Sequence, residues 1–185
     1  MTGMSSDAVS HPALVPWIQR LDTIRSHWLS GHADIWTTWR ALMDWCHALI
    51  RRLRRWHYDY ILESDGQPIW LQPDDLPLKD GLECLWRLIE RLAPMEQTTV
   101  PETLVRAWID TVETLIPWVV HGGKATVYWY RCILATYEWN ATWGERLLHR
   151  LYVYGQRTPH PEHQRLIRGA LDYFRIIRSR GGQGT

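Results

Sequence analysis

The sequence predicts an all-α protein, folded as a single-domain bundle of about six or seven helices with one long central helix. Apolar residues recur at steps of three and four positions along most of the chain, in segments longer than ordinary strands. Glycine, proline and polar clusters separate these segments. A chain of 185 residues is long enough to bury its own core. We expect the bundle over residues 13–180, between a flexible N-terminus at 1–12 and a flexible glycine-rich tail at 181–185.

Two amphipathic segments predict the first two helices. The first is expected to open near Pro16, because proline suits the first turn of a helix, and to end near Gly31. The second is expected to run from Asp34 to about Glu63, since apolar residues recur there at helical spacing. About thirty residues, each rising about 1.5 Å, would make a rod roughly 45 Å long. This rod is the predicted spine of the fold.

Turn and capping signals predict a third helix. Residues 64–68 form a turn cluster, and a short hairpin is an open alternative in the loop that follows. Asp80 and Glu83 have the spacing of a capping box, in which two side chains satisfy backbone N–H groups at a helix start. We therefore expect a helix that begins at Asp80 and ends at Pro94.

The fourth and fifth helices are expected between residues 99 and 143. Thr99 and Glu102 repeat the capping box, Pro117 should bend the last turn, and the glycine pair 122–123 should end the helix. The next segment, 124–143, is apolar nearly all round. Its aromatic start would also suit a strand, but its length favours a helix through the middle of the bundle.

Two more helices are expected in the last forty residues. Gly144 is predicted to break the buried helix before a short helix that ends at Gly155. The final helix is predicted to start at Pro161.

The cysteines and the hydropathy favour a cytoplasmic protein. Cys46, Cys84 and Cys132 form no C-x-x-C pair, which argues against a disulfide framework or a zinc ribbon. We expect them to be small buried hydrophobic residues in a reducing compartment. No segment approaches the roughly 20 apolar residues that a membrane span needs, and no signal peptide is visible.

Two residue types are unusually frequent. The chain has thirteen tryptophans but one phenylalanine, and nineteen arginines but two lysines. Tryptophan and arginine have GC-rich codons, so the base composition of the gene explains much of this bias. Aromatic rings also fill cores because of their size, so the bias alone does not indicate a function.

Charges are segregated along the chain although the net charge is only +1. Residues 40–58 carry a net charge of +4, residues 59–120 carry −8, and residues 121–185 carry +6. Two interpretations remain open. The basic segments present a positive surface to a polyanion, or they pair with the acidic centre of the same chain.

The second helix is expected to carry a basic stripe on the side opposite its apolar face. This stripe comprises Arg40, Asp44, His47, Arg51, Arg54, Arg55 and Tyr58. Phosphate groups would relieve the repulsion between the arginines, because guanidinium binds phosphate through two hydrogen bonds. The alternatives are a solvated face and a face that is paired with the acidic centre.

The last helix supplies a second basic set, Arg165, Arg168, Arg175, Arg178 and Arg180. Asp172 has the helical spacing to pair with Arg168 or Arg175. We expect the two helices to form one surface, on which Trp56, Tyr58 or Tyr154 would stack on bases. The predicted phosphate-binding residues are Arg51, Arg52, Arg54, Arg55, Arg168 and Arg175.

No motif in the sequence predicts an enzyme or a cofactor. The chain has no G-x-S-x-G sequence, no P-loop and no H-E-x-x-H sequence. His160, Glu162 and His163, with His57 or His149 as a third histidine, form only a weak candidate metal cluster. We therefore predict a non-catalytic protein without a bound metal.

The C-terminal segment resembles one known family. Residues 144–148, 170–175 and the glycines at 181–182 are similar to the end of the helical small subunits of type III CRISPR effector complexes, where an aromatic amphipathic helix precedes glycines. The resemblance covers about a fifth of the chain. It implies several copies lined along other subunits, which hold a guide or target strand by phosphate contacts and perform no catalysis.

Two function classes follow from the sequence. The first is a non-catalytic subunit of a nucleoprotein assembly that binds the backbone of single-stranded RNA or DNA, together with other protein subunits. The second is a helical scaffold that binds partner proteins through exposed tryptophans and binds no nucleic acid. Steep salt dependence of nucleic-acid binding would distinguish the first from the second.

Overall fold

The computed structural model describes residues 14–54, 61–64, 67–70, 76–92 and 100–181. Within these ranges the chain forms eight helices and one two-stranded antiparallel sheet. The elements are α1 Val15–Leu29, α2 Ile35–Arg54, β1 Ile61–Ser64, β2 Gln67–Trp70, α3 Leu78–Leu92, α4 Glu102–Thr114, α5 Ile116–Val119, α6 Gly123–Trp139, α7 Ala141–Arg157 and α8 Pro161–Gly181.

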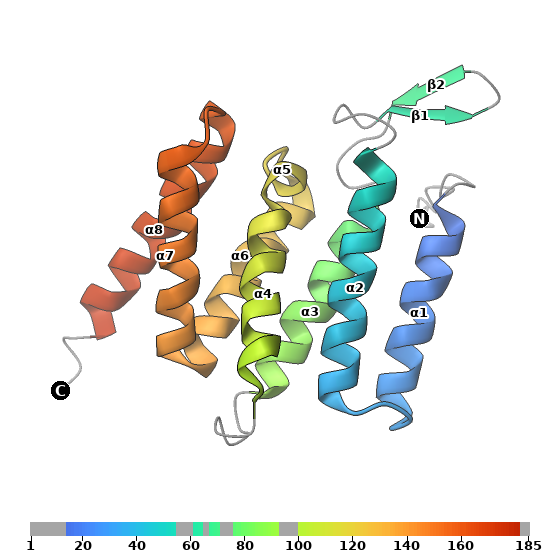
Figure 1. Cartoon of the computed structure of the whole chain (residues 1–185), viewed down its shortest axis with the longest axis horizontal. Helices are drawn as coiled ribbons and strands as arrows, with labels where there is room; N and C mark the ends of the chain where they lie inside the picture. The colour runs from blue at the N-terminus through green and yellow to red at the C-terminus, as the bar shows by residue number, and fades with distance from the viewer. Residues whose placement is uncertain (1–13, 55–60, 65–66, 71–75, 93–99, 182–185) are drawn as a thin grey trace, which may run out of the picture.

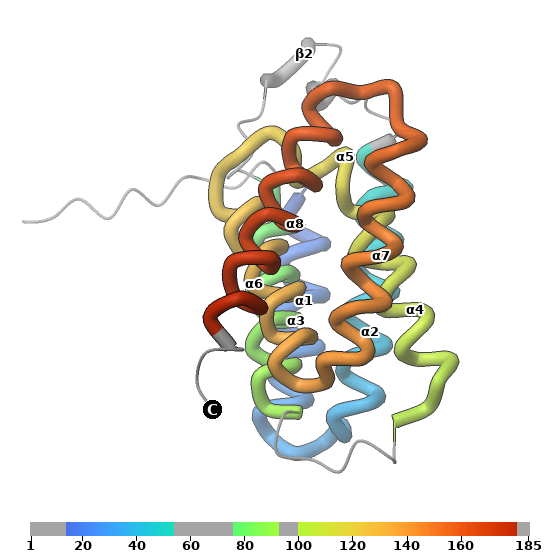
Figure 2. Tube along the Cα trace, turned by 90° about the vertical axis from the view of Figure 1, so that its left-hand side faces the viewer, coloured from blue at the N-terminus to red at the C-terminus, as the bar shows by residue number. Residues whose placement is uncertain are grey.

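The long helices stand side by side in two layers. One layer holds α2, α4 and α7, and the other holds α3, α6 and α8, with α1 beside α2 (Figures 1 and 2). Successive long helices run in opposite directions, and α1 and α8 lie at opposite ends of the molecule (Figure 1). The most extensive contact between two helices joins α3 to α6 within one layer. This packing of helices confirms the predicted all-α class, with the hairpin added at one edge.

The second helix is shorter than the sequence predicts. Asp34 does cap it, since the Asp34 carboxylate accepts a hydrogen bond of 2.7 Å from the Thr37 N–H, and this bond lowers the pKa of Asp34. The helix ends at Arg54, however, and has 20 residues. It is therefore not the longest helix, because α8 has 21 residues. The predicted continuation to Glu63 is wrong because residues 61–64 form β1.

A hairpin replaces the expected end of the long helix. Ser64 pairs with Gln67 in the strand register, which leaves two residues, 65–66, between the strands. Those residues are Asp-Gly, the sequence most typical of two-residue hairpin turns. The hairpin that the sequence leaves open as an alternative is therefore present. Its first strand begins at Ile61, before the turn cluster at 64–68, whereas the sequence indicates a hairpin only in the loop after that cluster.

Two predicted capping boxes are not formed. The helix α3 starts at Leu78, so Asp80 lies within its first turn. Pro101 is the N-cap of α4, where no side chain caps the helix. The predicted bend at Pro117 is instead a break, because α4 ends at Thr114 and Pro117 lies in the first turn of the short α5.

The buried helix breaks four residues earlier than expected. Asn140 ends α6 and caps α7, since its side-chain oxygen accepts a hydrogen bond of 3.2 Å from the Trp143 N–H. Gly144 instead lies inside α7, where a Cβ would come within 2.6 Å of the Tyr137 Cα. Gly144 is therefore a point of close approach between α6 and α7. The helix also continues past Gly155, so the predicted short helix is wrong.

A chain of five tryptophan rings connects four helices. Trp39 lies at its centre and is fully buried. Its ring centroid is 6.3 Å from Trp36, 5.8 Å from Trp108 and 5.6 Å from Trp139. Trp139 continues the chain to Trp143 at 4.8 Å. Tilted and edge-on pairs at these distances stabilise the packing of α2, α4, α6 and α7 beyond the area that they bury.

Indole N–H groups join the two layers through hydrogen bonds. The Trp108 N–H on α4 donates to the Thr136 hydroxyl on α6 at 2.9 Å. The Trp129 N–H on α6 donates to the Val112 carbonyl on α4 at 3.0 Å. Both bonds are buried, so each satisfies a polar group that would be costly to leave without a partner.

Within the described ranges, no helix combines the length and the apolar character that crossing a membrane would require. Of the predicted flexible segments, residues 1–12 and 182–185 lie outside these ranges, and Gly181, the first residue of the predicted tail at 181–185, instead closes α8.

Candidate nucleic-acid interface

The acidic centre of the chain pairs with α7. Arg146 binds Glu102 at 2.6 Å, and Arg150 binds both Asp110 at 2.6 Å and Glu113 at 2.9 Å. The hydrogen bond from Arg146 lowers the pKa of Glu102. Of the two open interpretations, pairing within the chain therefore holds for Arg146 and Arg150, which join α7 to α4.

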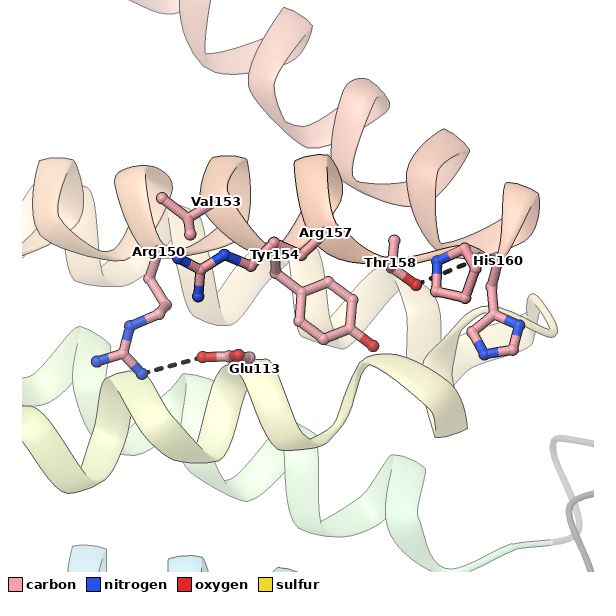
Figure 3. Close-up of a pocket in the computed structure, with 8 residues that line it drawn as sticks. Glu113, Arg150, Val153, Tyr154, Arg157, Thr158 and His160 are labelled. Carbon is pink, nitrogen blue, oxygen red and sulfur yellow. Dashed lines mark hydrogen bonds and ion pairs between the residues drawn. The ribbon is translucent and has the colours of Figure 1, made fainter.

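A cleft of about 560 Å³ lies between α4 and α7. Figure 3 shows the Arg150 guanidinium beside Glu113, with Arg157 and Tyr154 along the same wall. Arg150 is held between two carboxylates, those of Asp110 and Glu113, so the pairs nearly cancel the charge of the arginines. A polyanion therefore has little electrostatic reason to bind in this cleft.

The arginines of α2 lie at its C-terminal end. Arg51 and Arg52 are exposed, and Arg51 makes no ion pair with any residue in the described ranges. Arg54 closes the helix, while Arg55 lies outside the described residues.

His47 does not belong to the predicted basic stripe. Its ring is half-buried and forms a hydrogen bond of 2.8 Å with the Thr111 hydroxyl on α4. Of the residues predicted for the basic stripe between positions 40 and 51, Arg40, Asp44 and Arg51 are exposed in the structure.

Three arginines of α8 are exposed and unpaired among the described residues. Arg165, Arg168 and Arg175 are exposed, and within the described chain none of them forms an ion pair. We call these three residues the α8 basic face. The predicted pairing of Asp172 with Arg168 or Arg175 is not formed in this structure. Arg178 is different, because its guanidinium binds the Glu145 carboxylate on α7.

The structure separates the two sets of arginines. The α2 arginines lie in the layer formed with α4 and α7, whereas α8 lies at the far end in the other layer (Figures 1 and 2). The single surface expected from the sequence is therefore not formed within one copy of the chain.

The aromatic residues near α8 differ from those expected. Tyr154 is half-buried and forms a hydrogen bond with His163, while Trp56 and Tyr58 lie outside the described residues. Tyr152, two positions earlier on α7, is 50 % exposed. Its position in the polar part of the helical repeat was the sequence signal that could have identified it.

The candidate metal cluster stays unsupported. Among the described residues, no group of three or more histidine, cysteine or carboxylate side chains has a geometry that could hold a metal ion. The rings of His160 and His163 lie 4.7 Å apart, and His57 is not described.

Cys46 and Cys132 are buried and Cys84 is half-buried, and burial raises the pKa of all three thiols.

His163 is a buried titratable group. Its side chain forms a hydrogen bond of 3.0 Å with the Tyr154 hydroxyl. Burial lowers the pKa of His163 below the ordinary value of 6.5, and the positive charges of His160 and His121 lower it further, against the opposing effect of Glu162. The folded protein therefore keeps this ring neutral at a pH where the unfolded chain protonates it.

We expect stability to fall as the pH falls from 7.5 to 5.5, partly through His163. Below pH 6.5 His163 binds a proton in the unfolded chain but stays neutral in the folded protein. This difference lowers the stability until the pH reaches the lowered pKa of the folded state. A tenfold difference in proton affinity corresponds to about 1.4 kcal/mol. Urea unfolding at both pH values should show a smaller loss for His163→Gln than for the wild type. An equal loss in the two proteins would assign the effect to other groups.

Comparison with known proteins gives no relative from which to assign a function. No protein-family model matches the chain, and neither the curated proteins nor the solved structures contain a significant match.

Proposed function

We propose that the chain is a non-catalytic helical subunit of a nucleoprotein assembly, and that the α8 basic face binds the phosphate backbone of single-stranded RNA or DNA. The observation that carries this proposal is the contrast between α7 and α8. The α7 arginines Arg146 and Arg150 are neutralised by α4, whereas Arg165, Arg168 and Arg175 make no ion pair with described residues. Phosphates supply the missing negative charge.

The local charge of α8 favours the same ligand. The helix contains five arginines and two acids over twenty-one residues. Arg168 and Arg175 are seven residues apart, so they lie on one side of the helix about 10 Å apart along its axis. Both side chains therefore reach the same bound strand.

The α2 arginines provide a second contact region in this proposal. Arg51 and Arg52 belong to α2, which lies far from α8 (Figure 1), and Arg54 closes the same helix. Two separate basic regions suit a subunit that stands beside further copies of itself, with each region touching a different part of the strand. The C-terminal resemblance to small subunits of type III CRISPR effector complexes supports this arrangement.

The alternative, a protein-binding scaffold with exposed tryptophans, has less support. The structure describes the side chains of eleven tryptophans, and none of these side chains is exposed. Six are buried, and the other five pack partly against the core. The largest described apolar exposures belong to scattered side chains such as Leu29, which do not form a docking surface by themselves.

Charge reversal on α8 tests the proposal. We expect Arg168→Glu/Arg175→Glu to weaken binding to a fluorescent single-stranded oligonucleotide by about ten- to a hundredfold at low salt, because two phosphate contacts become repulsive. The slope of log affinity against log salt should also become shallower by about 1.4. Fluorescence anisotropy measures both quantities.

A matched control carries the same change in net charge at the opposite end of the molecule. Arg20→Glu/Arg25→Glu alters two exposed arginines of α1 and should leave the affinity within about twofold of the wild type. The proposal fails if the α8 variant binds as tightly as the wild type, or if both variants lose affinity equally.

A further inference from the structure

Two contacts fix the register between α7 and α8. A Cβ on Gly155 would lie 3.2 Å from the Ile167 side chain, and Glu145 binds Arg178. The two helices run in opposite directions, and each rises about 1.5 Å per residue. Tyr152 therefore lies at the level of about residue 170 or 171 on α8, between the levels of Arg168 and Arg175.

The same contacts fix the direction in which Tyr152 points. Tyr152 follows Glu145 by seven residues, or about two turns, so both side chains lie on one side of α7. The ion pair between Glu145 and Arg178 shows that this side faces α8. Tyr152 therefore lies beside α8.

The facing side of α8 carries arginines. Arg168, Leu171, Arg175 and Arg178 are spaced by three, four and three residues, so they form one line along the helix. Arg178 reaches α7, which places this line next to the side of α7 that carries Tyr152. The register thus places Tyr152 between the levels of two exposed arginines and at about the level of half-buried Leu171.

Tyr152 has the properties of a stacking residue. Its side chain is 50 % exposed, and it has no ring contact or hydrogen bond with any described residue. An exposed aromatic ring beside phosphate-binding arginines is the arrangement by which proteins hold single strands, because an unpaired base stacks on the ring. A base within a duplex is already stacked between its neighbours and is not available to the ring.

We infer that Tyr152 stacks on a base of the strand that Arg168 and Arg175 hold, and that the bound nucleic acid is unpaired at this position. The inference rests on the proposed function and adds the base contact to it. It also gives the surface a preference for single strands over duplexes, which the arginines alone do not provide.

Three substitutions of exposed tyrosines test the inference. Tyr152→Leu keeps an apolar side chain at this position but removes the aromatic face, and should weaken binding to a single-stranded oligonucleotide about 5- to 150-fold. Tyr152→Phe keeps the ring and should bind within about twofold of the wild type. Tyr173→Leu is the matched control, because Tyr173 is 47 % exposed and its ring packs edge-on against Phe174.

Salt and strand dependence separate this inference from the proposed function. Tyr152→Leu should leave the salt slope unchanged, since no phosphate contact is lost, and should reduce the preference for a single strand over a duplex of the same sequence. If Arg168→Glu/Arg175→Glu binds like the wild type, the proposed function fails. If that variant loses affinity while Tyr152→Leu does not, the stacking inference alone is overturned. Equal losses for Tyr152→Leu and Tyr173→Leu would also overturn it.

Discussion

Replacing Trp39 with alanine is expected to lower the free energy of unfolding by about 3–5 kcal/mol. The side chain is fully buried, and its ring contacts those of Trp36, Trp108 and Trp139. Alanine would leave a large cavity among helices of both layers and would remove aromatic pairs, each worth about 0.5–1.5 kcal/mol beyond the buried area. Because proteins of this size are typically stable by about 5–15 kcal/mol, a large part of the folding free energy would be lost. Urea unfolding followed by far-ultraviolet circular dichroism measures the change.

Phenylalanine substitutions at two neighbouring positions provide the control. The Trp39 N–H is buried and has no hydrogen-bond acceptor among the described residues, whereas the Trp108 N–H donates to the Thr136 hydroxyl. Both substitutions remove the same volume, but only Trp108→Phe loses a hydrogen bond. We expect Trp108→Phe to cost about 1 kcal/mol more than Trp39→Phe. The reverse order would contradict this account of the core.

Replacing Gly144 with alanine is expected to lower the free energy of unfolding by about 1–3 kcal/mol. A Cβ at this position would lie 2.6 Å from the Tyr137 Cα and 2.8 Å from the Tyr137 Cβ. Because a backbone atom is involved, rotation of a side chain cannot relieve the clash, and α6 and α7 must separate. The clash outweighs the gain of about 1 kcal/mol that alanine normally brings to a helix. Thermal and urea unfolding measure the result.

Gly155 offers the matched comparison on the same helix. A Cβ there would meet only the side chain of Ile167, at 3.2 Å, which can shift by a few tenths of an ångström. Gly155→Ala should therefore change the stability by less than about 1 kcal/mol. A stabilising effect of Gly144→Ala would show that α6 and α7 do not approach as closely as described.

The sequence predicts two helix starts correctly where proline sets the backbone, at Pro16 and at Pro161. Pro16, Pro117 and Pro161 each lie in the first turn of a helix, because the fixed φ angle of proline is a local property. The break between α6 and α7 depends on packing instead. Glycine is a sequence signal for a helix break, but Gly144 lies inside α7, where the absence of a side chain allows α6 to pack closely against α7. Asn140 carries the actual break through its cap.

The end of α2 was mispredicted because two local signals compete. Residues 61–64 continue the apolar spacing of the helix, and they also precede an Asp-Gly pair that favours a hairpin. Periodicity alone cannot decide between helix and strand over four residues. The pairing with residues 67–70 decides it.

The charges of the candidate site were predictable, but their partners were not. The sequence leaves open whether the basic stripe is exposed or paired, and in the structure Arg51, Arg168 and Arg175 are exposed. Nothing in the sequence indicates that α4 lies beside α7, so the neutralisation of Arg146 and Arg150 by distant acids could not be foreseen. Tyr152 was missed for the same reason, because its relation to the α8 arginines depends on the register between two helices.

The chain of tryptophan rings gives the protein an internal optical reporter. Five indoles from α2, α4, α6 and α7 are held in fixed mutual orientations at centroid distances of 4.8 to 6.3 Å. Fixed aromatic environments produce near-ultraviolet circular dichroism, and this signal vanishes when specific packing is lost even if the helices persist. The signal from this cluster therefore reports on the mutual packing of four helices, separately from the helical content of the chain.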